Sequence, residues 1–176
     1  AMMYSVAAGG KRLRPILLMA AADAVGAKGS DFVAVAAGLE MIHTYSLIHD
    51  DLPSMDNDDY RRGRLTNHKV FGDAMALLAG DGLLTQAFEV MLEQRGVDPK
   101  VLLEVVRLVA KCAGPTGMVG GQALDITSED QQLTLEQMKK LHEAKTGAMF
   151  VAAVRGGAML GGADPETLRI MTHFAN

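Results

Sequence analysis

Five aspartates lie within ten consecutive residues of the sequence, in the run Asp50-Asp51-Leu52-Pro53-Ser54-Met55-Asp56-Asn57-Asp58-Asp59. Crowded carboxylates repel one another at close range, and a divalent cation would relieve that repulsion. Because the run offers hard oxygen ligands and neither histidine nor cysteine, it favours Mg²⁺, which binds through one or two carboxylates together with substrate phosphates. A solvated acidic loop remains the alternative. An EF-hand is excluded, because its required glycine and closing glutamate are out of place.

Two basic groups accompany the acidic run. One follows it directly as Arg61-Arg62-Gly63-Arg64, and the other lies earlier as Gly9-Gly10-Lys11-Arg12-Leu13-Arg14-Pro15. Adjacent acidic and basic blocks suit a site in which a metal and guanidinium groups hold one polyanion. In the earlier group the glycines admit close backbone approach, and the N-terminus of a following helix favours an anion. Ordinary salt bridges and an exposed basic turn remain the alternatives, and the spacing of a Walker motif is absent.

Single polar residues elsewhere could join such a site. His43 lies seven residues before Asp50, so on a helix both would point the same way, about 10.5 Å apart along the axis. Gln122 and Asp125 would share one helical face, and Lys145 interrupts an otherwise apolar run. A partly buried histidine, and a lysine whose amine reaches solvent, are the ordinary explanations for two of these residues.

The elements that must position these residues are predicted to be helices, because Ala, Leu, Met, Glu and Lys dominate and aromatic residues are only 5%. One face of the second expected helix carries Phe32, Val35, Leu39, Ile42, Ser46 and His49 at spacings of three and four. The helices are expected at Pro15 to about Val25, Ser30 or Asp31 to Pro53, Asp73 to about Gln94, Pro99 to about Ala113, Thr134 through Lys145 toward Leu160, and from Pro165 onward. An all-α antiparallel bundle follows.

Composition excludes several classes of protein. The 176 residues are 49% hydrophobic and 22% charged, values that suit a globular core and exclude wholesale disorder. A net charge of −4 argues against a nucleic-acid partner. The single cysteine, Cys112, excludes an intrachain disulfide framework and favours a cytoplasmic location. Without an uninterrupted apolar run of about 18 residues, no stable membrane insertion is expected.

In this order, the motifs resemble those of the trans-polyprenyl diphosphate synthases, most nearly the bacterial short-chain type that makes farnesyl diphosphate. The block that combines DDxxxxD with RRG is highly specific. The matching segments span nearly the whole sequence and are GGKRLRP (9–15), EMIHTYSLIHDDLPSMDNDDYRRG (40–63), TNHKVFG (66–72), LLAGD (77–81), GGQALD (120–125) and KTG (145–147).

The resemblance implies an isoprenoid synthase fold, in which an antiparallel helix bundle surrounds a central cavity, and a homodimer. It implies a Mg²⁺-dependent prenyltransferase that condenses isopentenyl diphosphate head to tail with an allylic diphosphate. By position, the metal ligands would be Asp50, Asp51, Asp56 and Asp125. The cations on the allylic diphosphate would be Arg61 and Lys145, with Thr146 and Gln122 beside the allylic group. The residues that hold isopentenyl diphosphate would be Lys11, Arg14, His43 and Arg62.

Product length should depend on the floor of the cavity beneath Asp50. Ser46 lies one helical turn back on the same face, and Tyr45 lies beside it, further round the helix. Because a tyrosine can block a growing tail, we hypothesise a C15 product, farnesyl diphosphate. A geranylgeranyl or other short-chain synthase is the alternative.

Two features of the family are not found in the sequence: the first helix before GGK, and a second aspartate-rich motif near the C-terminus. Residues 1–176 are therefore expected to form a partial isoprenoid synthase domain. Two other functions remain open, a class I terpene cyclase and a non-catalytic regulatory subunit of a synthase. The GGKRLRP block argues against a cyclase, which has no isopentenyl diphosphate to hold, and the full set of charged motif residues argues against a regulatory subunit.

Overall fold

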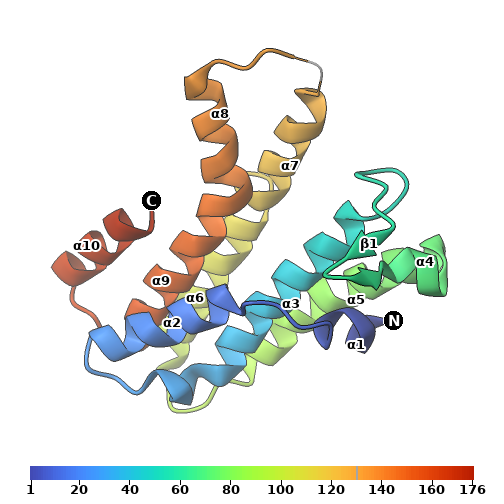
Figure 1. Cartoon of the computed structure of the whole chain (residues 1–176). Coiled ribbons are helices and arrows are strands. Elements are labelled where there is room, and N and C mark those ends of the chain that lie inside the picture. Colours follow the sequence, from blue (N-terminus) through green and yellow to red (C-terminus); the bar gives the residue numbers. More distant parts are fainter. Residues whose placement is uncertain (130) are drawn as a thin grey trace.

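The computed structural model describes residues 1–129 and 131–176, and helices make up most of the described chain (Figure 1). The expected all-α class is confirmed. In chain order the elements are α1 (Met2–Val6), α2 (Leu13–Ala24), the 3₁₀ turn η1 (Gly29–Phe32), α3 (Val33–Asp50), β1 (Tyr60–Arg61), β2 (Arg64–Leu65), α4 (Asn67–Phe71), α5 (Asp73–Leu92), α6 (Pro99–Ala113), α7 (Met118–Thr127), α8 (Leu135–His142), the π-helical turn η2 (Glu143–Gly147), α9 (Ala148–Leu160) and α10 (Pro165–Ala175).

The centre of the bundle is the pair of long helices α3 and α5, which run antiparallel, with α2 and α6 packed on α9 (Figure 1). The apolar stripe expected on α3 is buried from Phe32 to Ile42. Helix packing on this scale removes the largest side chains from water, and that burial is the main stabilising force. The fully buried side chains include Leu18, Val35, Leu39, Ile42, Ile48, Leu83, Met91, Val105, Val109 and Met149.

Helices α8 and α9 form one rod, in which the five-residue π-helical turn η2 joins the two α-helical parts (Figure 1). The rod begins as expected at a capping box, in which the Thr134 side chain accepts from the Gln137 backbone and the Gln137 side chain accepts from the Thr134 backbone. The π-helical turn was not expected. Such wide turns are rare and often occur at functional sites, and this one carries Lys145.

Three expected boundaries are confirmed: α3 ends at Asp50, before Pro53, and the Asp98 and Asp164 side chains cap α6 and α10. Two starts differ. Helix α2 begins at Leu13, so Pro15 is its third residue, which is tolerated because the first backbone N–H groups of a helix have no partner within it. Helix α3 begins at Val33, after the 3₁₀ turn η1, rather than at the expected Ser30 or Asp31, whereas α5 begins at Asp73 as expected.

Two stretches, Gly29–Asp50 and Asp73–Leu92, have the length and mean hydropathy of membrane-crossing helices. They contain α3 and α5, which pack against each other at the centre of the bundle. The same composition is ordinary for the core helices of a helical bundle, so length and composition alone are weak evidence for a membrane segment.

Helix α9 crosses α2 at Gly157, where a Cβ atom would collide with the backbone carbonyl of Leu18. At the neighbouring Gly156, a Cβ atom would only touch Val105 Cγ1, at 3.5 Å. We expect Gly157→Ala to lower the free energy of unfolding by about 1–3 kcal/mol through overpacking. Gly156→Ala is the matched control and should be neutral or stabilising by up to about 1 kcal/mol, because alanine favours helix. Equal effects of the two variants in urea denaturation would contradict this account of the crossing.

Candidate active site

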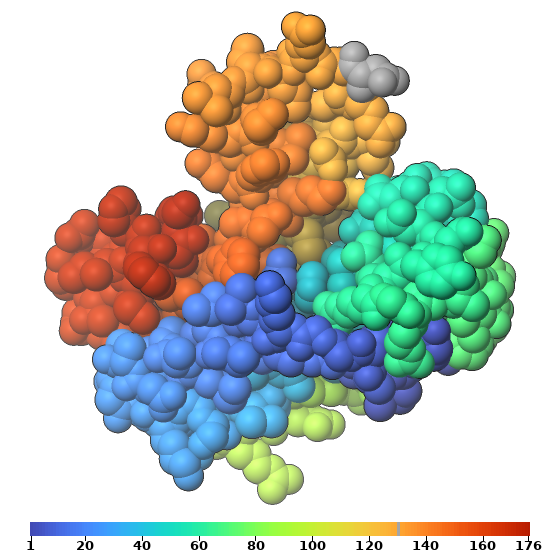
Figure 2. Space-filling model, viewed as in Figure 1, coloured from blue at the N-terminus to red at the C-terminus, as the bar shows by residue number. Residues whose placement is uncertain are grey.

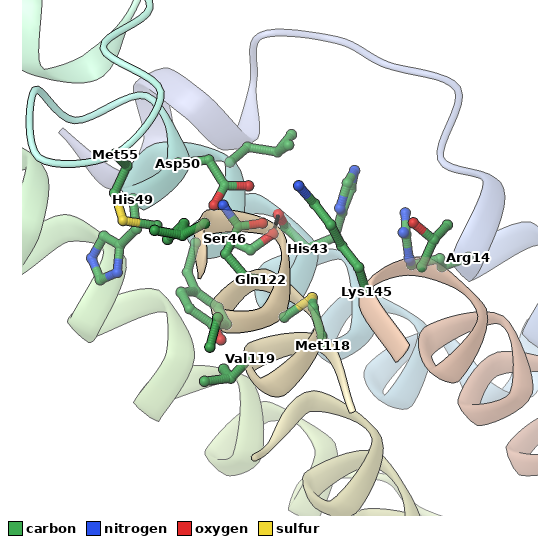
Figure 3. A pocket seen from close by; sticks show the side chains of 15 residues that line it. Arg14, His43, Ser46, His49, Asp50, Met55, Met118, Val119, Gln122 and Lys145 are labelled. Carbon is green, nitrogen blue, oxygen red and sulfur yellow. Dashed lines mark hydrogen bonds between the residues drawn. The ribbon is translucent and has the colours of Figure 1, made fainter. Parts of the chain in front are cut away.

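A cavity of about 450 Å³ lies between the second half of α3, the loop after it, α7 and η2 (Figure 3). Strands β1 and β2 pair antiparallel as a hairpin. In the space-filling view a recess opens between helices α7 and α8 on one side and the loop between α3 and this hairpin on the other (Figure 2). We call this the apolar cavity, because most of its wall is hydrocarbon, supplied by Leu47, Met55, Met118, Val119, Ala123 and Ile126. A pocket of this kind can hold a hydrocarbon chain away from water.

Asp50 and Lys145 supply charge to the apolar cavity from opposite walls, α3 and η2 (Figure 3). The loop after α3 folds back so that the Asp56 backbone N–H donates to the Asp50 carbonyl at 2.8 Å. Burial, and next the negative charge of Asp56, raise the pKa of Asp50 from 3.8 to about 6, against the opposing effects of Lys145 and Arg61. Asp50 is therefore a carboxylate that a nearby cation would stabilise in its ionised form.

Tyr45 and Ser46 both line the apolar cavity, as expected from their positions before Asp50. Tyr45 is only 6% exposed, and its ring packs edge-on against His49 at a centroid distance of 5.7 Å. His49 Nε2 lies 2.9 Å from the Leu77 carbonyl of α5. A carbonyl oxygen can only accept, so the ring nitrogen is the donor of this hydrogen bond. Because His49 packs against one side of the tyrosine ring, the position of Tyr45 in the cavity wall is fixed.

The wall formed by α7 brings Gln122 into the apolar cavity (Figure 3). Both polar atoms of the Gln122 side chain are buried and have no hydrogen-bond partner among the described residues. Helix α7 can approach η2 closely because Gly121 lies against the Lys145 backbone, where a Cβ atom would collide. Lys145 Nζ pairs with Asp125 Oδ2 at 2.5 Å, and Thr146 completes this wall. A buried amide without a partner is costly, so a ligand that binds here would recover lost hydrogen bonds.

A second cavity, of about 500 Å³, adjoins the first and shares Arg14 and His43 with it. We call it the basic cavity, because its lining includes Lys11, Arg12, Arg14 and Arg62. Burial, and next the charges of Arg14, Arg62, Arg61 and Arg12, lower the pKa of His43 to about 3. His43 is therefore neutral at pH 7, and the surrounding positive potential makes this cavity suitable for an anion.

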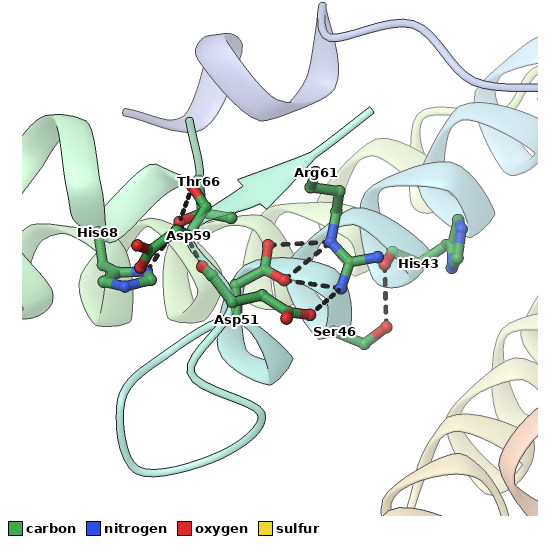
Figure 4. Close-up of polar contacts among 8 residues, drawn as sticks. His43, Ser46, Asp51, Asp59, Arg61, Thr66 and His68 are labelled. Carbon is green, nitrogen blue, oxygen red and sulfur yellow. Dashed lines mark hydrogen bonds and ion pairs between the residues drawn. The ribbon is translucent and has the colours of Figure 1, made fainter. Parts of the chain in front are cut away.

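Asp51, which is buried, and Arg61, which is partly exposed, form an ion pair beside these cavities (Figure 4). Arg61 Nη2 donates to Asp51 Oδ1 at 2.6 Å, and Arg61 Nε lies 2.9 Å from both carboxylate oxygens. The hydrogen bond to Asp51 is the main cause that raises the pKa of Arg61. Consecutive residues on a helix point about 100° apart, so Asp50 faces the apolar cavity while Asp51 faces the hairpin.

Two aspartates near the apolar cavity offer oxygen atoms to a metal ion. Among residues 1–129 and 131–176, no cluster of three or more His, Cys, Asp or Glu side chains is close enough to hold a metal. Asp50 and the exposed Asp56 nevertheless offer hard oxygen atoms, and the charge of Asp56 contributes to the raised pKa of Asp50. Two such carboxylates, completed by ligand phosphates and water, fit Mg²⁺.

The structure brings most of the expected residues together. Eight of them line the apolar cavity: Arg14, His43, Tyr45, Ser46, Asp50, Gln122, Lys145 and Thr146. Lys11 and Arg62 lie in the basic cavity, whereas Asp51, Asp56, Arg61 and Asp125 line neither. Sequence reasoning missed Met118 and Ile126, although their spacing of four from Gln122 places them on its helical face, and it missed Glu40.

Known proteins resemble this chain over its whole length. A family model described as "Polyprenyl synthetase" matches residues 1–176. Farnesyl diphosphate synthases from Geobacillus stearothermophilus and Bacillus subtilis (strain 168) are 54% and 47% identical, each over 99% of this chain and 60% of the relative. The crystal structure of an FPP/GFPP synthase from Zymomonas mobilis superposes with a TM-score of 0.94 at 41% identity, over 99% of this chain and 64% of that one. The chain therefore spans 60% of the length of these two synthases.

The raised pKa of Asp50 makes the stability of the chain depend on pH. Between 3.8 and about 6 the folded carboxyl keeps a proton that the unfolded chain has lost, so the free energy of unfolding falls as pH rises through this window. We expect Asp50→Asn to remove that fall: the variant should match the parent near pH 4 and be more stable at pH 7. Urea denaturation in chelator at a series of pH values measures this, with the exposed Glu89→Gln as control. If the free energies of unfolding of parent and variant differ by a constant amount from pH 4 to 7, this account of Asp50 is contradicted.

Proposed function

This chain belongs to the polyprenyl synthetase family, and from that premise we propose that it carries the substrate-binding walls of a short-chain prenyltransferase. Its fold is the all-α isoprenoid synthase fold of its solved relatives. The proposed reaction condenses isopentenyl diphosphate head to tail with an allylic diphosphate. The observation that supports it best is the junction of two cavities, one apolar and one basic, at Arg14 and His43.

The allylic diphosphate would lie with its hydrocarbon tail in the apolar cavity and its diphosphate near Asp50 and Lys145. In the first step the allylic C1–O bond breaks, and its electron pair leaves with the diphosphate. Lys145 and Arg61 would stabilise the departing negative charge without protonating it. Hydrocarbon walls exclude water, which would otherwise react with the carbocation. The mechanism therefore requires charged groups at the open end of the apolar cavity and only uncharged groups at its floor.

Mg²⁺ is the proposed cofactor, held by Asp50 and Asp56. When bound, it would neutralise charge on the allylic diphosphate. Asp51 and Asp125 also remain proposed ligands. Each already pairs with a cation, Arg61 or Lys145, and would reach a metal only after that pair opens.

Isopentenyl diphosphate would bind in the basic cavity. Lys11, Arg14 and Arg62 would hold its diphosphate as fixed cations, and neutral His43 would donate one hydrogen bond. Its double bond, at the shared wall, then attacks the allylic cation and forms the new C–C bond. Loss of a proton completes the step, and the released diphosphate is the proposed base.

The proposed product is farnesyl diphosphate, because Tyr45 lines the apolar cavity and its ring would block a longer tail. A geranylgeranyl or other short-chain synthase is the alternative. A class I terpene cyclase is less well supported, because a basic cavity for isopentenyl diphosphate would serve no purpose in it. A regulatory subunit is disfavoured for a similar reason, since both cavities keep their charged residues.

We further propose a homodimer and a cytoplasmic location. Apolar side chains are exposed along α4 and α5, and burial against a second copy would remove them from water. These side chains are Val70, Phe71, Met75, Leu77, Leu78 and Leu92. A single cysteine is compatible with a reducing compartment.

The direct test is incubation of the purified protein with Mg²⁺, geranyl diphosphate and isopentenyl diphosphate. We expect farnesol after hydrolysis of the product, detected by gas chromatography and mass spectrometry, and loss of that product in chelator. Asp50→Asn should lower turnover at least about 100-fold, because a main source of leaving-group stabilisation is lost. Absence of any condensation product from the parent protein would overturn the proposal, and product without isopentenyl diphosphate would favour the cyclase.

The proposed floor of the cavity predicts a change in product length. We expect Tyr45→Ala to shift the product from C15 toward C20, because removal of the ring leaves room for another isoprene unit. Phe174→Ala, an exposed aromatic on α10, is the control and should leave the product unchanged. If Tyr45→Ala still makes only the parent's product, another residue forms the floor.

A further inference from the structure

Glu40 is an unexpected residue in the wall of the basic cavity, because a carboxylate opposes the binding of an anion. Its side chain is only 10% exposed, and it lies on α3, three residues before His43. Its Oε1 atom accepts from Arg12 Nη1 at 2.5 Å. A buried carboxylate with one strong partner is costly to desolvate and adds little stability by itself, so its position among the cations calls for another explanation.

Arg12 connects Glu40 to the loop that bears the cations. Its guanidinium donates to Glu40 and also, through Nη2, to the Val6 carbonyl at the end of α1, at 2.6 Å. Its backbone has φ 50, the left-handed conformation that disfavours residues other than glycine. Its carbonyl accepts from the Ile16 backbone at 3.1 Å, the bond that starts α2. The conformation of Arg12 therefore sets the direction of the chain at Lys11, directly before it, and at Arg14, two residues after it.

The same region must hold many positive charges without a bound anion. The charges of Arg14, Arg62, Arg61 and Arg12 all act on His43, and Glu40 is the acidic residue that acts on Arg14. Arg62 approaches the same loop from the hairpin and donates to the Gly9 carbonyl. Mutual repulsion would spread these side chains toward solvent unless a negative charge is built in among them.

We propose that Glu40 is a positioning residue for the anion site: by fixing Arg12, it holds Lys11 and Arg14 in the arrangement that receives a diphosphate. This inference deepens the proposed function and rests on it. Glu40 does not touch the anion and repels it weakly. Its net effect on affinity is nevertheless favourable, because the cations are already oriented before the ligand binds.

The proposal predicts the opposite sign from simple electrostatics. We expect Glu40→Gln, which removes a negative charge from the site, to weaken the binding of inorganic pyrophosphate about tenfold. Arg12→Lys keeps the charge but loses the planar fork that spans Glu40 and Val6, and it should also weaken binding. The double variant Glu40→Gln/Arg12→Lys should bind no more weakly than the weaker of the two single variants, because both residues act as one unit.

Isothermal titration calorimetry with pyrophosphate in chelator measures these affinities, and thermal melts without ligand confirm that each variant is folded. Glu166→Gln is the matched control, because Glu166 forms an exposed ion pair with Arg169 on α10, at 2.7 Å. Lys11→Gln tests whether pyrophosphate binds in the basic cavity. If the parent does not bind pyrophosphate, or if Lys11→Gln leaves its affinity unchanged, the proposed isopentenyl diphosphate site is wrong. If Lys11→Gln weakens binding but Glu40→Gln is neutral or tighter, that site stands and the role of Glu40 is refuted.

Discussion

Charges of like sign are crowded together around both cavities, and the geometry of the site depends on how that repulsion is contained. Three ion pairs contain it, Arg61–Asp51, Lys145–Asp125 and Arg12–Glu40. In each pair a side chain implicated in binding is held by a partner of opposite sign that comes from a different element of the chain. Substrate and metal would then add charges to an array that is already oriented, which lowers the reorganisation that binding requires.

The end of helix α3 lies where charged groups and hydrocarbon meet. The proposed function would require Asp50 to be close enough to Asp56 and Lys145 to share a ligand, and to lie beside a wall of hydrocarbon. The end of α3 achieves both, because its buried stripe packs on α5 while its last turn opens into the cavity. The raised pKa of Asp50 is the electrostatic result of placing a carboxylate at that boundary between water and hydrocarbon.

The fold was largely predictable from sequence, because helix caps and apolar spacing are local signals. Asp98, Thr134 and Asp164 mark helix starts through their own side chains. The site was predictable in outline only. The different directions of Asp50 and Asp51 follow from helix geometry. The partner of Asp51, Arg61, comes from a hairpin that no local sequence pattern predicted. Glu40 shares a helical face with His43, yet its bond to Arg12 depends on a left-handed backbone that the sequence does not signal.

The π-helical turn that carries Lys145 has a consequence for which changes of length the chain tolerates. A turn of this kind holds one residue more than a regular helical turn, so removing one residue from 143–147 would restore an unbroken α-helix. Because one turn absorbs the extra residue, the faces of α8 and α9 on either side would keep their relative directions, and only the side chains within the turn would be redirected. The Lys145 cation would then leave its place in the cavity wall, whereas the buried face of α9 would stay in the core. Loss of that one residue should therefore disturb the charged wall before it disturbs the packing of the rod.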